Sequence, residues 1–276
     1  MPEIDRLWYT IGVNTSELET GVSRAEQQFN KLVGTVANLA ATIGIAFGFQ
    51  GIIRDIQNLT RGFDTAMRQV WTLTDMTTEE FNKLKDSVIE LSKEGPYSAE
   101  ALASALYQTI SAGVDAGNAI DFLSQAMKAA QAGVTDLFTA VDGLTTIMNA
   151  WGLSMEELSR VSDSIFVAVR EGKTTFTELT MTIGTVAPTA SQAGISLEEV
   201  LSAVAALTKQ GIDTARAMTS LNYAIQSVIA PTEEAKKTAQ GLGIEFNASA
   251  LASKGLVQFL RDIYTAAQGN QFIPYL

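Results

Sequence analysis

The sequence predicts an all-α protein, built as an elongated array of antiparallel helices joined by tight turns. Two observations indicate this fold. Between residues 111 and 213 a glycine recurs every 17 to 22 residues, about the length of one short helix with its turn. Between these glycines, apolar residues recur at helical spacing. The six glycines are Gly113, Gly133, Gly152, Gly172, Gly194 and Gly211.

Each of these glycines opens a short phrase that can end one helix and begin the next. Glycine adopts the left-handed conformation that closes a helix, because it has no Cβ to clash. Two positions later, a Ser, Thr or Asp can accept a hydrogen bond from the first free N–H groups of the next helix. In two phrases a glutamate completes a capping box, as Ser154 with Glu157 and Ser196 with Glu199. The six glycines are therefore predicted to be structural turn residues.

Small residues between the turns favour close packing of the helices. Alanines cluster on the expected helices, at positions Ala126, Ala129, Ala130, Ala132, Ala203, Ala205 and Ala206. They let helix axes approach closely, so a stack or solenoid is favoured over a loose bundle. With two helices per unit, the repeat would be about 40 residues, as in helical-repeat proteins.

Local signals predict the elements on either side of the glycine repeats. Thr77 and Glu80 form a capping box for a helix through Leu91, and Ser98 opens the next helix. Pro188 should divide the helix that begins near Thr175, giving a short helix that ends at Gly194. A break is expected at residues 230–232. A less regular portion should follow from residue 241, and residues 270–276, without cap or periodicity, resemble the end of a fragment.

The N-terminal part is predicted to hold a short extended segment and a long apolar helix. Residues 7–13 alternate in polarity, which is typical of a strand. Ser16 and Glu19 form a further capping box at the start of a helix. The predicted domains are an N-terminal segment over 1–58, a helical core over 59–245 and a C-terminal remnant over 246–276.

Residues 32–53 contain no charged residue and allow two interpretations. At 22 residues the stretch is long enough to span a bilayer, which needs about 20. It also carries small residues that suit close contact with an identical helix, namely Ala37, Ala40, Gly44, Gly48 and Gly51. The first interpretation is a buried or self-associating helix with these residues as its contact face, and the second is a membrane-active segment.

Composition argues against an enzyme and against a nucleic-acid site. The chain contains no His and no Cys, which removes the commonest general base, the usual triad partner and the commonest metal ligands. Neither phosphate-binding glycine motif occurs. Adjacent glutamates occur at residues 79–80, 156–157, 198–199 and 233–234, where each pair is expected in the first turn of a helix. The net charge of −11 and the absence of a Lys/Arg run disfavour phosphate backbones as partners. No catalytic, metal or cofactor site is predicted.

Several of these phrases together resemble the core of phage tail tape-measure proteins. They are the segments at residues 108–115, 129–135, 148–154, 186–196, 207–213 and 229–232, so the resemblance covers about residues 60–245. The N-terminal part, a short extended piece that leads into a long helix and a Gly/Ala-rich apolar stretch, also resembles these proteins. The chain departs from the family in its length, because a long ruler portion and any lytic domain are missing. It is therefore expected to be a fragment, a truncated remnant or one piece of a split gene.

The resemblance implies a structural role in a virion. Such proteins form a helical core inside the growing tail tube, template its assembly and length, and leave the tube as DNA is delivered. The implied location is the tail lumen, after assembly in the host cytoplasm. The implied partners are further copies of the chain, the tail-tube protein, tail assembly chaperones and tail-tip proteins. Contact with the host membrane during DNA delivery is also implied. A membrane-active protein acting through residues 32–53 is the alternative.

Overall fold

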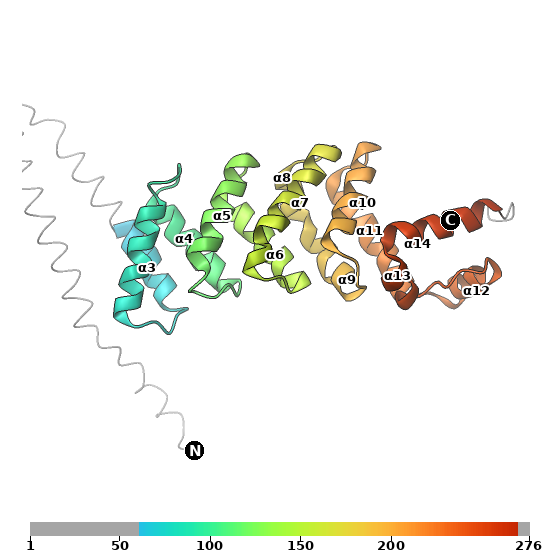
Figure 1. Ribbon diagram of the computed structural model, residues 1–276, viewed down its shortest axis with the longest axis horizontal. Coiled ribbons are helices and arrows are strands. Elements are labelled where there is room, and N and C mark those ends of the chain that lie inside the picture. Colours follow the sequence, from blue (N-terminus) through green and yellow to red (C-terminus); the bar gives the residue numbers. More distant parts are fainter. Residues whose placement is uncertain (1–60, 270–276) are drawn as a thin grey trace, which may run out of the picture. The chain divides into compact units, whose positions relative to one another are not determined.

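The computed structural model describes residues 61–269, and these residues are helical or lie in turns, with no strand among them (Figure 1). The chain divides into two compact units, Met1–Gly62 and Phe63–Leu276. The expected strand at residues 7–13 and the expected apolar helix at residues 32–53 lie outside the described residues. The predicted all-α class is confirmed for the described part of the chain.

A helical stretch over residues 61–71 leads into a series of short helices. The first six of these are α3 (Thr78–Leu91), α4 (Ala99–Ser111), α5 (Ala119–Ala132), α6 (Leu137–Trp151), α7 (Leu158–Glu171) and α8 (Phe176–Thr182). The remaining six are α9 (Ala187–Gln192), α10 (Leu197–Lys209), α11 (Thr214–Ile229), α12 (Glu233–Gly241), α13 (Ala248–Lys254) and α14 (Leu256–Gly269). Single 3-10 turns, Met155–Glu157 and Ile183–Thr185, precede α7 and α9.

The predicted capping boxes at Thr77, Ser154 and Ser196 are confirmed, and the one predicted for Ser16 with Glu19 lies outside the described residues. The Glu80 N–H donates to the Thr77 hydroxyl at 3.3 Å, and the Thr77 N–H donates to the Glu80 carboxylate at 2.8 Å. Ser196 and Glu199 repeat the arrangement at α10, with distances of 3.2 and 3.1 Å. A further box at α8, Thr175 with Glu178, has the same spacing and was missed in the sequence.

The two proline breaks are also confirmed. Pro188 lies at the start of α9, directly after a 3-10 turn that separates α9 from α8. It fits there because a proline in the first turn of a helix gives up an N–H group that has no partner within the helix. Helix α11 ends at Ile229, just before Pro231, and Thr232 then caps α12.

Beyond Gly241 the expectation of a less regular portion is wrong. Helices α13 and α14 follow, and α14 is 14 residues long. Gly255, with φ of 74°, joins them. The α14 stripe of Leu256, Phe259 and Ile263 packs against the core, and the Leu256 N–H donates to a Glu199 carboxylate oxygen at 2.7 Å. The predicted domain boundary after residue 245 stays a prediction.

Helix contacts arrange the described unit in two layers. Helices α4, α6, α8 with α9, and α11 contact one another in this order and form the first layer. Helices α3, α5, α7 and α10 do the same in the second layer, which α14 extends. From α3 to α11, consecutive helices also contact each other across the layers, so the chain alternates between them, with α8 and α9 counted together. One continuous apolar core runs between the layers, from Phe63 to Phe259.

Candidate functional site

The acidic pairs of the sequence lie at helix starts and not in a catalytic constellation. All four pairs fall in first turns, as predicted. A hydrogen bond from the Ser154 hydroxyl lowers the pKa of Glu156, and one from the Ser154 backbone N–H lowers the pKa of Glu157. A general acid working near neutral pH needs the opposite shift. These carboxylates therefore serve as caps. Within residues 61–269, no group of three or more acidic residues is placed to hold a metal ion.

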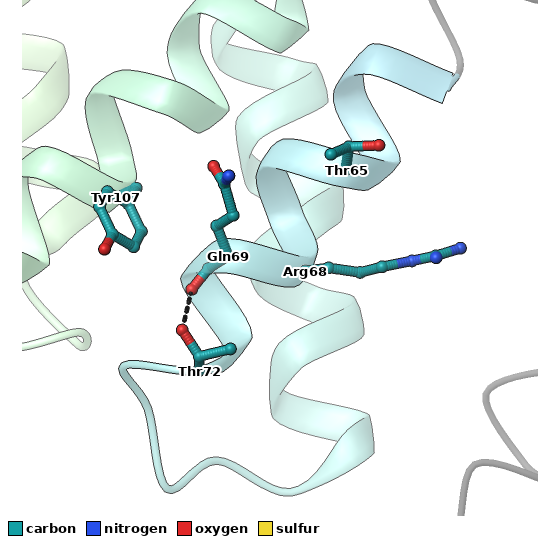
Figure 2. Close-up of a pocket in the computed structure, with 5 residues that line it drawn as sticks. All are labelled: Thr65, Arg68, Gln69, Thr72 and Tyr107. Carbon is teal, nitrogen blue, oxygen red and sulfur yellow. Dashed lines mark hydrogen bonds between the residues drawn. The ribbon is translucent and has the colours of Figure 1, made fainter.

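A shallow hollow of about 390 Å³ lies between the 61–71 helix and α4. Its lining consists of Thr65, Arg68, Gln69, Thr72 and Tyr107. Figure 2 shows Arg68 extending away from Tyr107, so the polar groups do not converge on one point. The Thr72 hydroxyl donates a hydrogen bond to the Gln69 backbone carbonyl at 2.7 Å. The hollow offers neither a positioned nucleophile nor a base.

The distinctive feature of the described unit is its row of turns, and four of the six glycines have left-handed backbone there. The φ angles are 98° at Gly113, 63° at Gly152, 72° at Gly194 and 94° at Gly211. At each of the four, the preceding helix ends within two residues. Only glycine adopts such angles without steric cost.

At the other two glycines the expected left-handed conformation is wrong, and close packing explains why glycine is there. Gly133 has φ of −84°, and Gly172 is extended with φ of −101°. A Cβ on Gly133 would lie 2.6 Å from Cγ of Phe176. A Cβ on Gly172 would lie 2.9 Å from the Ala205 Cα. Both positions exclude side chains because a neighbouring helix approaches too closely.

The left-handed residue of the α5–α6 turn is instead Val134, with φ of 51°. A β-branched residue is strained in this conformation, by roughly 1–2 kcal/mol. Its side chain is 91% exposed, so almost no packing offsets the strain.

We expect Val134→Gly to raise the free energy of unfolding by about 0.5–1 kcal/mol, after allowing for the larger unfolded-state entropy of glycine. Denaturant unfolding followed by circular dichroism measures this. The matched control is Val167→Gly, at an exposed position in the middle of α7, where glycine should cost about 1 kcal/mol. Destabilisation by both changes would contradict the strain at Val134.

At Gly152 the left-handed position is already occupied by a glycine, so adding a side chain there should introduce the strain. No atom of the described residues lies within 4 Å of a Cβ built on it, so a substitution there tests backbone conformation alone. Gly152→Val should lower stability by about 1–2 kcal/mol. Ser202→Val, on the exposed side of α10, is the matched control, and equal losses in melting temperature would contradict the left-handed turn.

Three hydrogen bonds connect turns that lie two helices apart, when α8 and α9 are counted as one helix. On one edge, the Asn149 side-chain amide donates to the Ala112 carbonyl and Trp151 Nε1 donates to the Ile195 carbonyl, both at 2.8 Å. On the other edge, the Lys173 N–H donates to the Thr208 hydroxyl at 3.1 Å. These pairs are 37, 44 and 35 residues apart, near the 40-residue repeat expected from the sequence.

A small hydroxyl cluster strengthens the second edge. The hydroxyl oxygens of Thr174 and Thr214 lie 2.7 Å apart, and Thr214 donates to the Glu178 carboxylate at 2.9 Å. Thr214 is buried, and its partners satisfy its hydroxyl group. The turns are therefore structural joints that hold successive helix pairs in register.

The proposed contact face of Ala37, Ala40, Gly44, Gly48 and Gly51 lies outside the described residues and stays a prediction. Among residues 61–269, no helix is both long and apolar enough to cross a membrane.

Comparison with known proteins gives a family for this architecture. Residues 85–271 match the family described as phage-related minor tail protein. A probable tape measure protein of Clostridium phage phiCD119 is 32% identical over 190 residues, which cover 67% of this chain and 20% of that protein. The tape measure protein of Pneumococcus phage Dp-1 is 25% identical over 184 residues, covering 67% of this chain and 16% of that protein.

The chain thus spans about a fifth or less of the length of these relatives. No solved structure matches it. The family match extends over more than half of the chain and includes α4 to α14 completely. This chain therefore belongs to the phage minor tail protein family, which includes tape measure proteins.

Proposed function

We propose that this chain is a structural virion protein, part of a tape measure that templates tail-tube assembly and length and is linked to DNA delivery. The observation that carries this proposal is the family match over residues 85–271. The described fold supports it, because the recurring glycine phrases of the sequence form joints of a helical array and not a catalytic site. Residues 59–245 would form the elongated array of antiparallel helices, between an N-terminal segment and a C-terminal portion.

A genetic test in the phage that encodes the chain addresses this role directly. A stop codon at position 61 should abolish tails of normal length, as seen by electron microscopy of lysates, and supplying the gene in trans should restore them. Normal numbers of full-length tails without the protein would refute the assignment. The protein should also be detected in purified wild-type tails before DNA delivery.

The proposed partners are further copies of the chain, the tail-tube protein, tail assembly chaperones and tail-tip proteins. Self-association is assigned to residues 32–53, whose uncharged surface would otherwise meet water. Gly44→Leu combined with Gly48→Leu should weaken this association by forcing the helices apart. Sedimentation velocity of the intact chain, compared with this variant, measures the effect.

The alternative function, a membrane-active protein, rests on the same uncharged stretch. It would require the intact chain to partition into liposomes without prior self-association. Leu39→Asp combined with Ile45→Asp should abolish such partition, because charged residues in a bilayer are costly. Partition that this variant leaves unchanged would point to a different surface of the chain.

No catalytic role is proposed. Purified protein should hydrolyse peptidoglycan no faster in a zymogram than the variant Glu156→Gln/Glu157→Gln. Activity lost in this variant would identify the pair as catalytic carboxylates. We expect instead a small loss of stability, because the pair only caps α7.

A further inference from the structure

Helix α14 is held to the array mainly through its first turn. Among its described side chains two are buried, and both are in this turn: Leu256 is 2% and Phe259 is 1% exposed. The Phe259 ring centroid lies 5.9 Å from that of Phe246. Further along the helix, Leu260 is 44% and Tyr264 is 64% exposed. Figure 1 shows α14 extending from this turn to the end of the described unit, so its distal part has less packing than its start.

A carboxylate from another helix caps the start of α14. The Leu256 N–H is among the first four N–H groups of the helix, which no carbonyl of the same helix can accept. The residue before it is Gly255, which has no side chain to cap it. Glu199 on α10 supplies the acceptor, with its Oε1 2.7 Å from the Leu256 nitrogen. Its other oxygen, Oε2, accepts the Ser196 N–H at 3.1 Å in the capping box of α10, so one carboxylate serves the starts of two helices.

Gly255 joins α13 to α14 directly beside the same carboxylate. Its φ of 74° is left-handed, which glycine adopts without steric cost. A Cβ at this position would lie 2.5 Å from Glu199 Oε1, so a side chain is excluded there for a second reason. A glycine between two helices can absorb a change of backbone angles, as hinge residues do. The joint is therefore able to turn unless another contact fixes it.

Two polar contacts that restrain this joint differ in strength. The Lys254 ammonium lies 2.8 Å from an Asp262 carboxylate oxygen, and the two side chains are 38% and 32% exposed. Water screens such a pair, so it contributes little. The Leu256–Glu199 hydrogen bond is partly buried and joins a backbone N–H at a helix start to a carboxylate, which is the stronger class of hydrogen bond. Glu199 is therefore the main polar restraint on the direction of α14.

We propose that α14 is a hinged helix and that Glu199 fixes its direction relative to the array. While the Leu256–Glu199 bond is made, α14 has a single orientation. When the bond opens, α14 turns about Gly255, and water hydrates the free N–H group and the carboxylate. The helices from α3 to α11 stay folded in both states, because most of their core lies between their own two layers. This device does not depend on the role of the protein in a tail.

Hydrogen exchange of the full chain, followed by mass spectrometry, tests this proposal. Glu199→Ala should speed exchange of the α14 amides about tenfold, since opening of α14 no longer breaks a charge-assisted hydrogen bond. Peptides from α4 to α6 should exchange as in the parent chain. The matched control is Glu80→Ala, which removes the capping-box carboxylate that accepts from Thr77 at the start of α3 and should leave α14 unchanged. Unchanged α14 exchange in Glu199→Ala, the same increase in both variants, or an increase that α4 to α6 share would overturn the proposal.

Gly255→Ala tests the joint from its other side. Alone, it crowds Glu199 Oε1 and should also speed α14 exchange. In the Glu199→Ala background that oxygen is gone, so the same change should speed exchange by a clearly smaller factor. Equal factors in both backgrounds would contradict the proposed restraint.

A distance measurement reports the direction of α14 itself. Because the chain has no Cys, nitroxide labels can be placed through Ser202→Cys on α10 and Thr265→Cys on α14, both at exposed positions. Double electron–electron resonance should give one narrow distance distribution in the parent chain and a broader one with Glu199→Ala. A distribution of unchanged width would overturn the hinge.

Discussion

Phe176→Ala is expected to lower the free energy of unfolding by about 4 kcal/mol, within the usual range for a buried phenylalanine. The side chain is only 1% exposed and fills the space between α8 and the α5–α6 turn. Its ring centroid lies 5.1 Å from that of Phe166. Removing the ring leaves a cavity where the two layers meet. Phe138→Ala, at a 43% exposed site, should cost far less in the same denaturant unfolding experiment.

The same residue should be coupled to Gly133. Gly133→Ala alone forces the new Cβ against Phe176, whose Cγ and Cβ lie 2.6 and 2.7 Å from its position. Without the ring, Cγ is gone and residue 176 can shift into the vacated space. We therefore expect the two substitutions together to cost at least about 1 kcal/mol less than the sum of the single changes. Strict additivity in this double-mutant cycle would contradict the close contact.

Gly143→Ala is expected to cost about 3 kcal/mol, near the upper end of the usual penalty for overpacking. Gly143 is buried in the middle of α6, where a Cβ would lie 2.3 Å from Cβ and 2.9 Å from Cα of Thr180 on α8. The positions of Thr180 Cα and Cβ are set by the backbone of α8, so a rotamer change cannot relieve the contact. The two helices would have to move apart.

Gly184→Ala is the matched control for this change. It is an exposed glycine, and the nearest atom to its added Cβ is Thr146 Cγ2 at 3.7 Å, an ordinary contact. Melting temperatures from circular dichroism compare the two. For a chain of this size, 3 kcal/mol corresponds to a drop of roughly 6–12 °C. Equal melting temperatures for the two variants would show that α6 and α8 do not cross as closely as described.

The sequence by itself determined the helices from Thr77 to Ile229, the positions of their turns and the division at Pro188. These features are local. A cap acts over three or four residues, and a proline blocks the hydrogen bond of its own helix, so neither depends on distant parts of the chain. The repeat of about 40 residues followed from the same signals, because equal spacing of turns predicts equal helix pairs.

Tertiary structure alone decided which glycines are needed for backbone conformation and which for close packing. Gly133 resembles Gly152 in sequence, but Phe176 from a distant helix excludes its side chain while Val134 takes the left-handed angle. The sequence did not predict the close packing at Gly143, because this glycine lies within an ordinary helical pattern. Thr180, the residue that excludes a side chain there, is 37 positions away. Each of these features depends on contacts between helices, which spacing along a single chain does not specify.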